Sequence, residues 1–307
     1  MNTQKIEQLN QEFAFETSSS SLRILSGSGG IPRIEIKNEA AGATISLQGA
    51  HLLSWIPKHQ NEVIWLSEEA KVTPGKSLRG GIPVCWPWFG AHETNDTFPA
   101  HGFARTVLWQ LTNAQAVSPH ETLITFKLVT NQLDDQYKKM WPQATQVEYT
   151  FSISESLKLE LTTSNLSDQS MILGQALHTY FNVEDVTATT VFGLENKEYL
   201  DKPDQFKRKT QTGAITINDE VDRIYLKTPD NVIINNKKRE IIIQKQGSQS
   251  TIVWNPGKNV AEKMGDLGND GYLKMLCVES ANAAEDTTVI KSGEAHKLSV
   301  EYKVKNI

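Results

Sequence analysis

Two apolar segments of this sequence each carry one side chain able to transfer protons. His178 lies in LGQALHTYF (residues 173–181), and Glu279 lies in LKMLCVESAN (residues 273–282). The first segment is apolar on both faces, so we predict a central, buried strand in which His178 is the group that titrates near neutral pH. A carboxylate such as Glu279 on an apolar strand must be paired or have a raised pKa. Both residues are therefore candidate general acids or bases.

Each of these residues also has a purely structural interpretation, which the sequence leaves open. His178 fits a core histidine that is hydrogen-bonded to the backbone. By strand alternation Glu279 lies on the same face as Leu273. There it fits either a general base with a tuned pKa or a buried ion pair with Arg79 or Arg105.

One long stretch, rich in glycine and proline, gathers candidate groups for binding an anion. It contains RGGIPVCWPWFG and HGFAR, in which Arg79, His101 and Arg105 stand among glycines, prolines and aromatics. A strand would not tolerate this much Pro and Gly. We therefore predict a rigid loop packed into the body of the protein, with its polar side chains directed at a common site. We expect Trp86 and Trp88 to shape the wall of that site.

The segment VDRIY places two opposite charges next to each other on a predicted strand. Asp222 and Arg223 must point to opposite faces. Asp222 is then either an acceptor for the hydroxyl groups of a ligand or part of a surface salt bridge.

No metal or cofactor pattern emerges. His51, His101, His178 and Glu279 lack the HxH or HxxxE spacing that puts two ligands on one strand face, so we expect no metal. The segment MGDLGNDG resembles half of a calcium-binding loop, but Cys277 stands where an EF-hand needs glutamate. We predict a turn there.

Short strand patterns account for most of the chain. Apolar residues occupy every second position over 147–153 and again over 157–161, which predicts a hairpin with one buried face. Short helices are predicted near 3–15 and 134–141. Because no long helix separates the strands, we expect an all-β protein, a large antiparallel β-sandwich. The other predicted strands are 22–25, 34–36, 43–47, 51–56, 63–66, 106–117, 122–130, 171–181, 186–192, 222–227, 231–236, 239–246, 250–254, 273–279 and 296–303.

Length and composition narrow the class of protein. The chain has 307 residues and a formal net charge of −5. We expect a single domain over 1–307. The mildly acidic charge argues against nucleic acid and anionic membrane surfaces as partners. The sequence has no apolar run of about 20 residues, so we expect no membrane span. The first residues lack the apolar core of a signal peptide. Cys85 and Cys277 lie in apolar surroundings, which is typical of free thiols in a reducing compartment, so we expect a cytoplasmic protein. We also expect a monomer.

Together these segments resemble the glucose-6-phosphate 1-epimerases, or hexose-6-phosphate mutarotases, of the aldose 1-epimerase superfamily. The matching motifs stand in the family's order and span most of the chain. They are RGGIPVCWPWFG, HGFAR, ALHTYF, DRIY, WNPG, MGDLGNDGY and CVESA. Each motif alone is of modest specificity, but jointly they are highly specific. The resemblance implies a galactose mutarotase-like supersandwich, in agreement with the strand pattern.

The resemblance implies acid–base chemistry without a cofactor. His178 and Glu279 match the family's catalytic histidine and glutamate. Interconversion of α and β anomers needs a base for the anomeric hydroxyl and an acid for the ring oxygen, each contributing about 10²–10⁴-fold. From ordinary charge preferences, we expect Glu279 to be the carboxylate base and protonated His178 to be the acid.

The resemblance also implies which residues bind the substrate. Arg79 and Arg105 match arginines of the phosphate and sugar site. Asp222 matches a sugar-binding aspartate, and His101 is expected to line the pocket.

Two other functions remain open at this stage. One is a mutarotase for unphosphorylated aldoses, and the other is a non-catalytic carbohydrate-binding β-sandwich. The two arginines favour a sugar phosphate, because charge-assisted hydrogen bonds from guanidinium groups contribute roughly 1.5–3 kcal/mol each. The presence of both His178 and Glu279 disfavours a non-catalytic protein. We therefore expect an isomerase that acts on hexose 6-phosphates.

Overall fold

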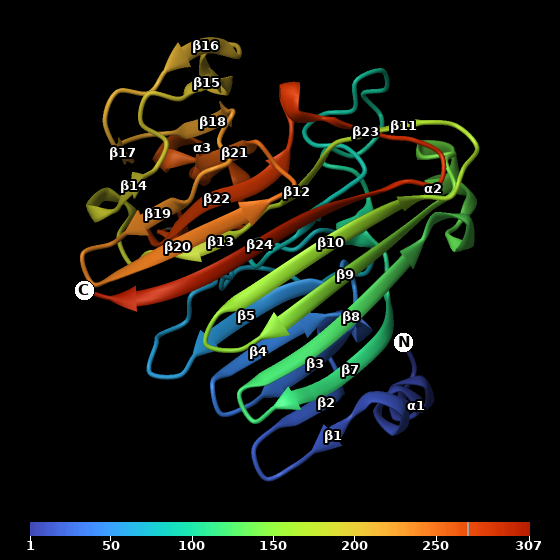
Figure 1. Ribbon diagram of the computed structural model, residues 1–307. Coiled ribbons are helices and arrows are strands. Elements are labelled where there is room, and N and C mark those ends of the chain that lie inside the picture. The colour runs from blue at the N-terminus through green and yellow to red at the C-terminus, as the bar shows by residue number, and fades with distance from the viewer. Residues whose placement is uncertain (269) are drawn as a thin grey trace.

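The strands of the protein form three large antiparallel sheets and one small one (Figure 1). The computed structural model describes residues 1–268 and 270–307. Asn269, which belongs to the MGDLGNDGY motif, lies outside the described residues. The predicted all-β, antiparallel architecture is confirmed. No described helix is long and apolar enough to cross a bilayer.

The first sheet is a meander whose five strands pair in chain order. Helix α1 (Thr3–Phe13) precedes it, within the segment predicted to be helical. The side chain of Asn2 accepts a hydrogen bond from the backbone N–H of Lys5 and so caps this helix, which buries Ile6. The strands are β1 (Phe15–Glu16), β2 (Ser21–Ser26), β3 (Pro32–Lys37), β4 (Ala41–Ser46) and β5 (His51–Pro57).

The second sheet has nine strands in the order β17-β14-β19-β20-β24-β10-β9-β8-β7. It contains the predicted hairpin, in which Leu157 pairs with Ile153 and Leu161 with Tyr149. Burial alternates along both strands, as the period of two predicts. The strands are β7 (Gln110–Ser118), β8 (Glu121–Val129), β9 (Thr145–Ile153), β10 (Leu157–Asn165), β14 (Thr190–Phe192), β17 (Ile215–Thr216), β19 (Val232–Asn235), β20 (Arg239–Gln246) and β24 (Ala295–Asn306).

The third sheet is built around β22 (Met275–Asn282), in which every residue is buried. One edge of β22 pairs with β21, and the other pairs with β12 and then with β13. The remaining strands of this sheet are β6 (Val84–Cys85), β12 (Gln175–Leu177), β13 (Tyr180–Asn182), β15 (Glu198–Asp201), β16 (Lys207–Thr210), β18 (Val221–Leu226) and β21 (Ser250–Asn255).

The long nine-stranded sheet covers both of the other large sheets. In Figure 1 its β7–β10 end lies against the five-stranded sheet, and its β19–β20 end lies against the eight-stranded sheet. One continuous apolar core fills both interfaces: it contains Ile45 with Phe151 at the first, and Val278 with Leu298 at the second. The nine-stranded sheet is therefore one layer of the β-sandwich, and the other two large sheets together form the opposite layer.

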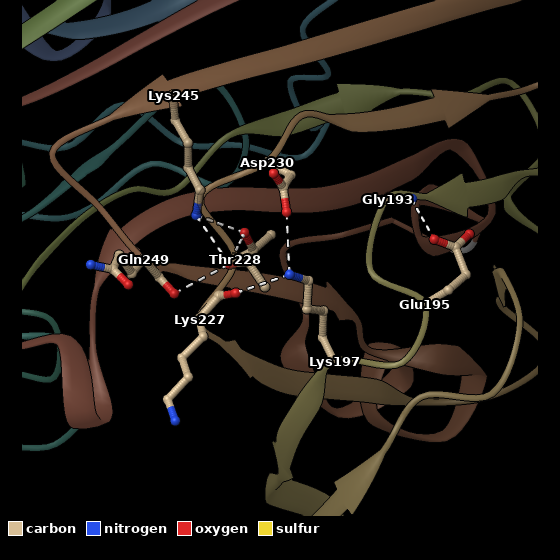
Figure 2. Close-up of polar contacts among 9 residues, drawn as sticks. Gly193, Glu195, Lys197, Lys227, Thr228, Asp230, Lys245 and Gln249 are labelled. Carbon is tan, nitrogen blue, oxygen red and sulfur yellow. Dashed lines mark hydrogen bonds and ion pairs between the residues drawn. The ribbon is translucent and has the colours of Figure 1, made fainter.

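Lys245 provides a polar connection between the nine-stranded and eight-stranded sheets. It lies on β20, and its buried ammonium nitrogen donates to Ser250 O at 2.5 Å and to Thr251 Oγ1 at 2.8 Å, both on β21. Thr228 Oγ1 is a further acceptor at 3.3 Å, as Figure 2 shows. Burial lowers the pKa of Lys245 to about 7. These oxygens compensate for part of the desolvation of the amine.

Helices are short and connect strands. The predicted helix near 134–141 is present as α2 (Asp135–Met140). Helix α3 (Gly257–Met264) has no counterpart in the prediction, and α4 (Gly271–Lys274) replaces the first residues of the strand predicted at 273–279. Leu273 therefore does not share a strand face with Glu279. The 3₁₀ turns are η1 (Ser28–Gly30), η2 (Ala104–Thr106), η3 (Thr130–Gln132), η4 (Val186–Ala188), η5 (Lys202–Asp204) and η6 (Ala284–Asp286).

Two predicted strands are wrong in ways that matter for the site. The segment 63–66 forms only isolated bridges, one of them between Ile64 and Phe181. The segment 171–181 is broken into β11 (Met171–Leu173), β12 and β13, and β11 pairs instead with β23 (Thr288–Ile290). The second break falls at His178, whose backbone N–H donates to Pro83 O rather than to a neighbouring strand.

Candidate active site

The register of the eight-stranded sheet brings His178 and Glu279 together. Leu177 pairs with Ser280 and Tyr180 with Cys277, so His178 lies opposite Glu279, in the gap between β12 and β13. His178 Nδ1 is 3.4 Å from Glu279 Oε1. Both side chains therefore face the same side of the sheet.

Neighbouring strands extend this face into the floor of a cavity. Glu279 pairs with Ile252 on β21, and Asp222 on β18 pairs with Trp254. Because side chains alternate along each strand, Ile252 and Trp254 project on the same face. A cavity of about 860 Å³ opens above this floor, and His178, Glu279 and Asp222 all line it.

Two atoms of the acid–base pair are buried without a hydrogen-bond partner among the described residues. They are His178 Nδ1 and Glu279 Oε2. His178 is 8% exposed and Glu279 only 1% exposed. Buried polar atoms are nearly always satisfied, so exceptions at a cavity wall indicate a place for a ligand. The ion-pair interpretation of Glu279 does not hold, because Glu279 forms no ion pair with either Arg79 or Arg105 in the described part of the chain.

Burial favours the uncharged form of each partner. Desolvation raises the pKa of Glu279 well above its usual value, and the nearby Asp222 carboxylate raises it further. Desolvation lowers the pKa of His178 well below its usual value, reinforced by His101 and Arg105. These shifts differ from the expected charge states, because the environment favours protonated Glu279 and neutral His178. The pair still holds one proton that either member can carry.

Arg79 is held in place at the cavity wall by two partners. Its Nε donates to Asp266 Oδ1 at 3.1 Å, and Nη1 donates to the hydroxyl of Tyr180 at 2.9 Å. Asp266 comes from the segment between α3 and α4. Arg79 also lines the cavity that holds His178 and Glu279.

The backbone around Arg79 requires glycine. Gly80 has a φ of 103°, and a Cβ there would lie 2.6 Å from Trp65 O. Gly81 has a φ of 72° and lies against His51. His51 itself lies outside the cavity that holds His178, and its Nε2 donates to Gly80 O at 2.8 Å. This explains why two glycines follow the arginine.

Arg105 has the freest guanidinium group of the cavity wall. It lies in η2 and its Nη2 donates to Ala100 O at 2.9 Å. Among the described residues it forms no ion pair with a carboxylate. It therefore keeps donors available for an anion.

His101 lines the cavity beside the acid–base pair. Its backbone is left-handed, with a φ of 66°, and its ring lies 5.8 Å from that of His178. Its Nδ1 accepts a hydrogen bond from Gly90 N at 3.3 Å. Burial lowers the pKa of His101 to about 3, with Arg105 adding to the effect. The neutral ring thus carries its proton on Nε2, where it can donate to a ligand.

Asp222 forms a salt bridge and also lines the cavity. Its carboxylate pairs with Lys202 at 2.6 Å, yet its side chain is only 13% exposed and lines the cavity. Burial raises the pKa of Asp222, and the hydrogen bond from Lys202 opposes that shift. Asp222 is thus a fixed acceptor at the end of the cavity floor.

The expected tryptophan wall is wrong. Trp86 is fully buried and donates to Thr163 Oγ1, and Trp88 donates to Pro99 O. Neither lines the cavity in the part of the chain that the structure describes. Phe89 and Trp254 supply the aromatic wall instead.

Sequence reasoning missed several other lining residues. Tyr180 stands two positions after His178, so strand alternation was a usable signal. Lys202 begins η5 and Phe206 lies between η5 and β16, in a polar segment without a periodic pattern, and Asp266 lies in a predicted turn. No sequence pattern distinguishes these three from ordinary surface residues.

This arrangement combines proton transfer with anion binding. One carboxyl–imidazole pair on the floor can give and take a proton, and two guanidinium groups on one wall can hold a multiply charged oxyanion. Asp222 and His101 add an acceptor and a donor suited to hydroxyl groups. The cavity is thus built for a small hydroxylated anion.

Comparison with known proteins places the chain among sugar epimerases. The model of the aldose 1-epimerase family matches residues 32–303. An Escherichia coli (strain K12) protein provisionally named glucose-6-phosphate 1-epimerase is 37% identical over 270 residues, which cover 86% of this chain and 87% of that protein. A protein of Cenchrus ciliaris with the same name is 35% identical over 260 residues, covering 82% and 78%.

Solved structures show the same fold. A crystal structure from Salmonella typhimurium, provisionally described as a mutarotase, matches with a TM-score of 0.84 at 30% identity, covering 99% of this chain and 100% of that one. Galactose 1-epimerase from Lactobacillus acidophilus NCFM matches with a TM-score of 0.72 at 14% identity, covering 94% and 99%. The expected galactose mutarotase-like sandwich is therefore confirmed.

Proposed function

The chain belongs to the aldose 1-epimerase family, and we propose that it interconverts the α and β anomers of glucose 6-phosphate by acid–base ring opening and closure. The observation that carries the proposal is the His178–Glu279 pair, whose two unpartnered atoms lie on the floor of a cavity that also receives Arg79 and Arg105. The names of the curated relatives point to the same substrate.

The one proton held by His178 and Glu279 suffices for the reaction. The member that carries it protonates the ring oxygen O5, while the other accepts the proton of the anomeric hydroxyl, and the C1–O5 bond breaks to give the open-chain aldehyde. Rotation about C1–C2 presents the other face of the carbonyl. The O5 hydroxyl then adds to C1 as both protons return. The pair ends with the number of protons with which it began, so the reaction is a true isomerisation.

The remaining groups hold the substrate so that C1 lies near the pair. Arg105 and the free part of the Arg79 fork bind the phosphate. Asp222 accepts hydrogen bonds from sugar hydroxyls, and neutral His101 donates one from Nε2. Binding two ends of the sugar fixes its middle, which provides the orientation that proton transfer requires.

Exchange spectroscopy by NMR tests this function on the unmodified protein. The rates of exchange between the α and β anomers are measured for glucose 6-phosphate and for glucose, with and without protein. We expect acceleration above the spontaneous rate for the phosphate ester and much less for glucose. Equal acceleration of both sugars would instead identify a mutarotase for unphosphorylated aldoses. No acceleration of either would identify a non-catalytic carbohydrate-binding protein.

We also propose that the protein works in the cytoplasm as a monomer. The buried free thiols of Cys85 and Cys277 suit a reducing compartment. His178, Glu279, Arg79 and Arg105 line one cavity within a single copy of the chain, which is compatible with a monomer. Light scattering coupled to size-exclusion chromatography measures the mass in solution, and a dimer would contradict the second part of this proposal.

A further inference from the structure

Phe206 is a large apolar side chain at the rim of the cavity whose position nothing in the reaction described above explains. It lies between η5 and β16, is 51% exposed, and lines the same cavity as His178 and Glu279. An exposed phenylalanine alone means little, because folded proteins expose much apolar surface. Its place at the mouth of a polar site is the feature that needs an explanation.

The backbone at this position is strained. Gln205 has a φ of 54° and Phe206 a φ of 57°, so two consecutive residues other than glycine are left-handed. A left-handed backbone is unfavourable for any residue with a Cβ, and glycine would avoid this strain. Strain of this kind persists where the surrounding structure enforces it, and it is concentrated at functional sites. The turn therefore holds the Phe206 ring at this place at an energetic cost.

Ion pairs brace the turn that carries Phe206. Lys202 reaches across to Asp222 at 2.6 Å, and Lys209 contacts Asp201 at 2.6 Å and Asp204 at 2.8 Å. Single pairs on a surface contribute little, but together they limit the movement of a short turn. The pair between Lys202 and Asp222 also ties the turn directly to the cavity floor. Phe206 is thus positioned before a ligand arrives.

The face of the Phe206 ring is available to a ligand. Among the described residues, Phe206 stacks against no other aromatic ring. Trp254 is different, because its ring packs edge-on against both His178 and Tyr180, at centroid distances of 5.9 Å. Two other aromatic lining residues are also engaged, because Phe89 packs edge-on against His101 at 4.9 Å and Tyr180 stacks on His178 at 4.8 Å. Ile224 and Ile252, which also line the cavity, are aliphatic. Phe206 is therefore the aromatic surface of this cavity that is free to pack against a flat ligand.

A pyranose ring needs such a surface. Its hydroxyl groups and phosphate form a polar edge that suits the arginines and Asp222, while its faces carry C–H groups. We propose that Phe206 is the platform against which one C–H face of the sugar ring packs, and that it selects closed-ring hexose phosphates over acyclic polyol phosphates. This inference rests on the proposed function, and it adds a residue that determines specificity.

Calorimetric titration with two unreactive ligands tests the inference. One is 1,5-anhydroglucitol 6-phosphate, a pyranose without an anomeric hydroxyl, and the other is glucitol 6-phosphate, an acyclic chain with the same phosphate. The proteins are the wild type, Phe206→Ala, Phe206→Tyr and, as a matched control, Phe192→Ala. Phe192 is also an exposed phenylalanine, at 40%, but it lies outside the cavity lining.

We expect Phe206→Ala to weaken binding of the ring ligand about tenfold and to change binding of the acyclic ligand less than about twofold. Phe206→Tyr should retain ring binding, and Phe192→Ala should bind both ligands as the wild type does. Thermal melting of each variant establishes that it is folded, as expected for a change at an exposed position.

Two results would overturn the inference while leaving the function intact. One is unchanged ring binding by Phe206→Ala, and the other is an equal loss for both ligands, which would make Phe206 a general part of the entrance. A wild-type protein that binds neither ligand would instead overturn the proposed function together with the platform. The two failures are therefore distinguishable.

Discussion

Arg79 and Arg105 line one cavity, but they differ in how many guanidinium hydrogen-bond donors remain available for a ligand. Arg79 already shares its guanidinium with Asp266 and Tyr180, whereas the guanidinium of Arg105 hydrogen-bonds, among the described residues, to the backbone carbonyl of Ala100 alone. We expect Arg105→Ala to raise the KM for glucose 6-phosphate about 10–100-fold, because a charge-assisted hydrogen bond to phosphate contributes roughly 1.5–3 kcal/mol. Steady-state exchange rates measure this. The KM for free glucose should change much less.

The matched control is Arg33→Ala, which removes an exposed arginine paired with Glu35 outside this cavity. It should leave the KM for both sugars unchanged. Arg105→Lys keeps the charge but loses the planar fork, and we expect an intermediate KM. An equal loss on both sugars for Arg105→Ala would show that this residue does not bind the phosphate.

At the residue scale, sequence reasoning located the principal polar groups of the site but not their surroundings. His178 and Glu279 stand out because each is a titratable group in an apolar segment. Their protonation depends on burial and on neighbouring charges such as Arg105 and His101, which are distant in sequence. The preferred form of the pair therefore could not be obtained from ordinary charge preferences.

The loop that carries Arg79 depends on one close backbone contact at Gly80. A side chain at this position would collide with the backbone of Trp65, at 2.6 Å, and of Leu66, at 2.7 Å. We expect Gly80→Ala to destabilise the protein by more than the roughly 1–2 kcal/mol of left-handed strain, and to raise the KM for glucose 6-phosphate because Arg79 moves with the loop. Chemical denaturation and exchange kinetics measure the two effects.

Gly75→Ala separates strain from collision. Gly75 has a φ of 75°, but a Cβ there meets nothing within 4 Å. The Gly75→Ala variant should lose only the stability that corresponds to left-handed strain, and its KM for glucose 6-phosphate should be unchanged. If Gly80→Ala behaved like Gly75→Ala in both measurements, the close approach would not position Arg79.

At the element scale, the predictions succeeded where burial imposes a period. The hairpin of β9 and β10 was predicted because every second residue faces the core. The hairpin of β15 and β16 was missed, since it is a polar edge of its sheet and has no apolar period. The break at His178 was also missed, because it depends on a hydrogen bond to Pro83 O, a tertiary contact. The Lys245 connection between sheets is of the same kind (Figure 2).

The stability of the whole molecule should depend on the buried neutral histidines. Burial lowers the pKa of His51 to about 4, against 6.5 for an exposed histidine. Between these values the unfolded chain binds a proton at His51 that the folded chain does not. This residue therefore contributes stability that is fully present above pH 6.5 and is lost as the pH falls towards 4.

We expect His51→Gln to remove this dependence. A glutamine amide can keep the hydrogen bond to Gly80 O but does not titrate. Relative to the wild type, the free energy of unfolding of the variant should improve by about 3 kcal/mol as the pH falls from 6.5 to 4. Urea denaturation at several pH values measures the difference, in which the other titrating groups cancel. A constant difference across this range would show that His51 is not buried in its neutral form.

At the scale of the whole molecule, the sandwich was predictable because many short strands without long helices leave few alternatives. How three sheets share one core was not, because sequence patterns report burial but not which sheet covers which. The convergence of residues from five strands and several loops on one cavity depends on that arrangement. It brings His178 and Glu279, about a hundred residues apart in sequence, together in one cavity, where we propose that they act on one substrate.

One measurement decides whether His178 and Glu279 act together on the substrate. It is the rate of exchange between the anomers of glucose 6-phosphate in His178→Ala, in Glu279→Gln and in the double variant. Because the two residues share one proton, each single change should remove most of the acceleration, about 10²–10⁴-fold. The double variant should then be about as slow as the slower single variant, since residues that act as a unit are not additive. Independent, multiplicative losses, or a folded single variant with the wild-type rate, would contradict the shared-proton mechanism.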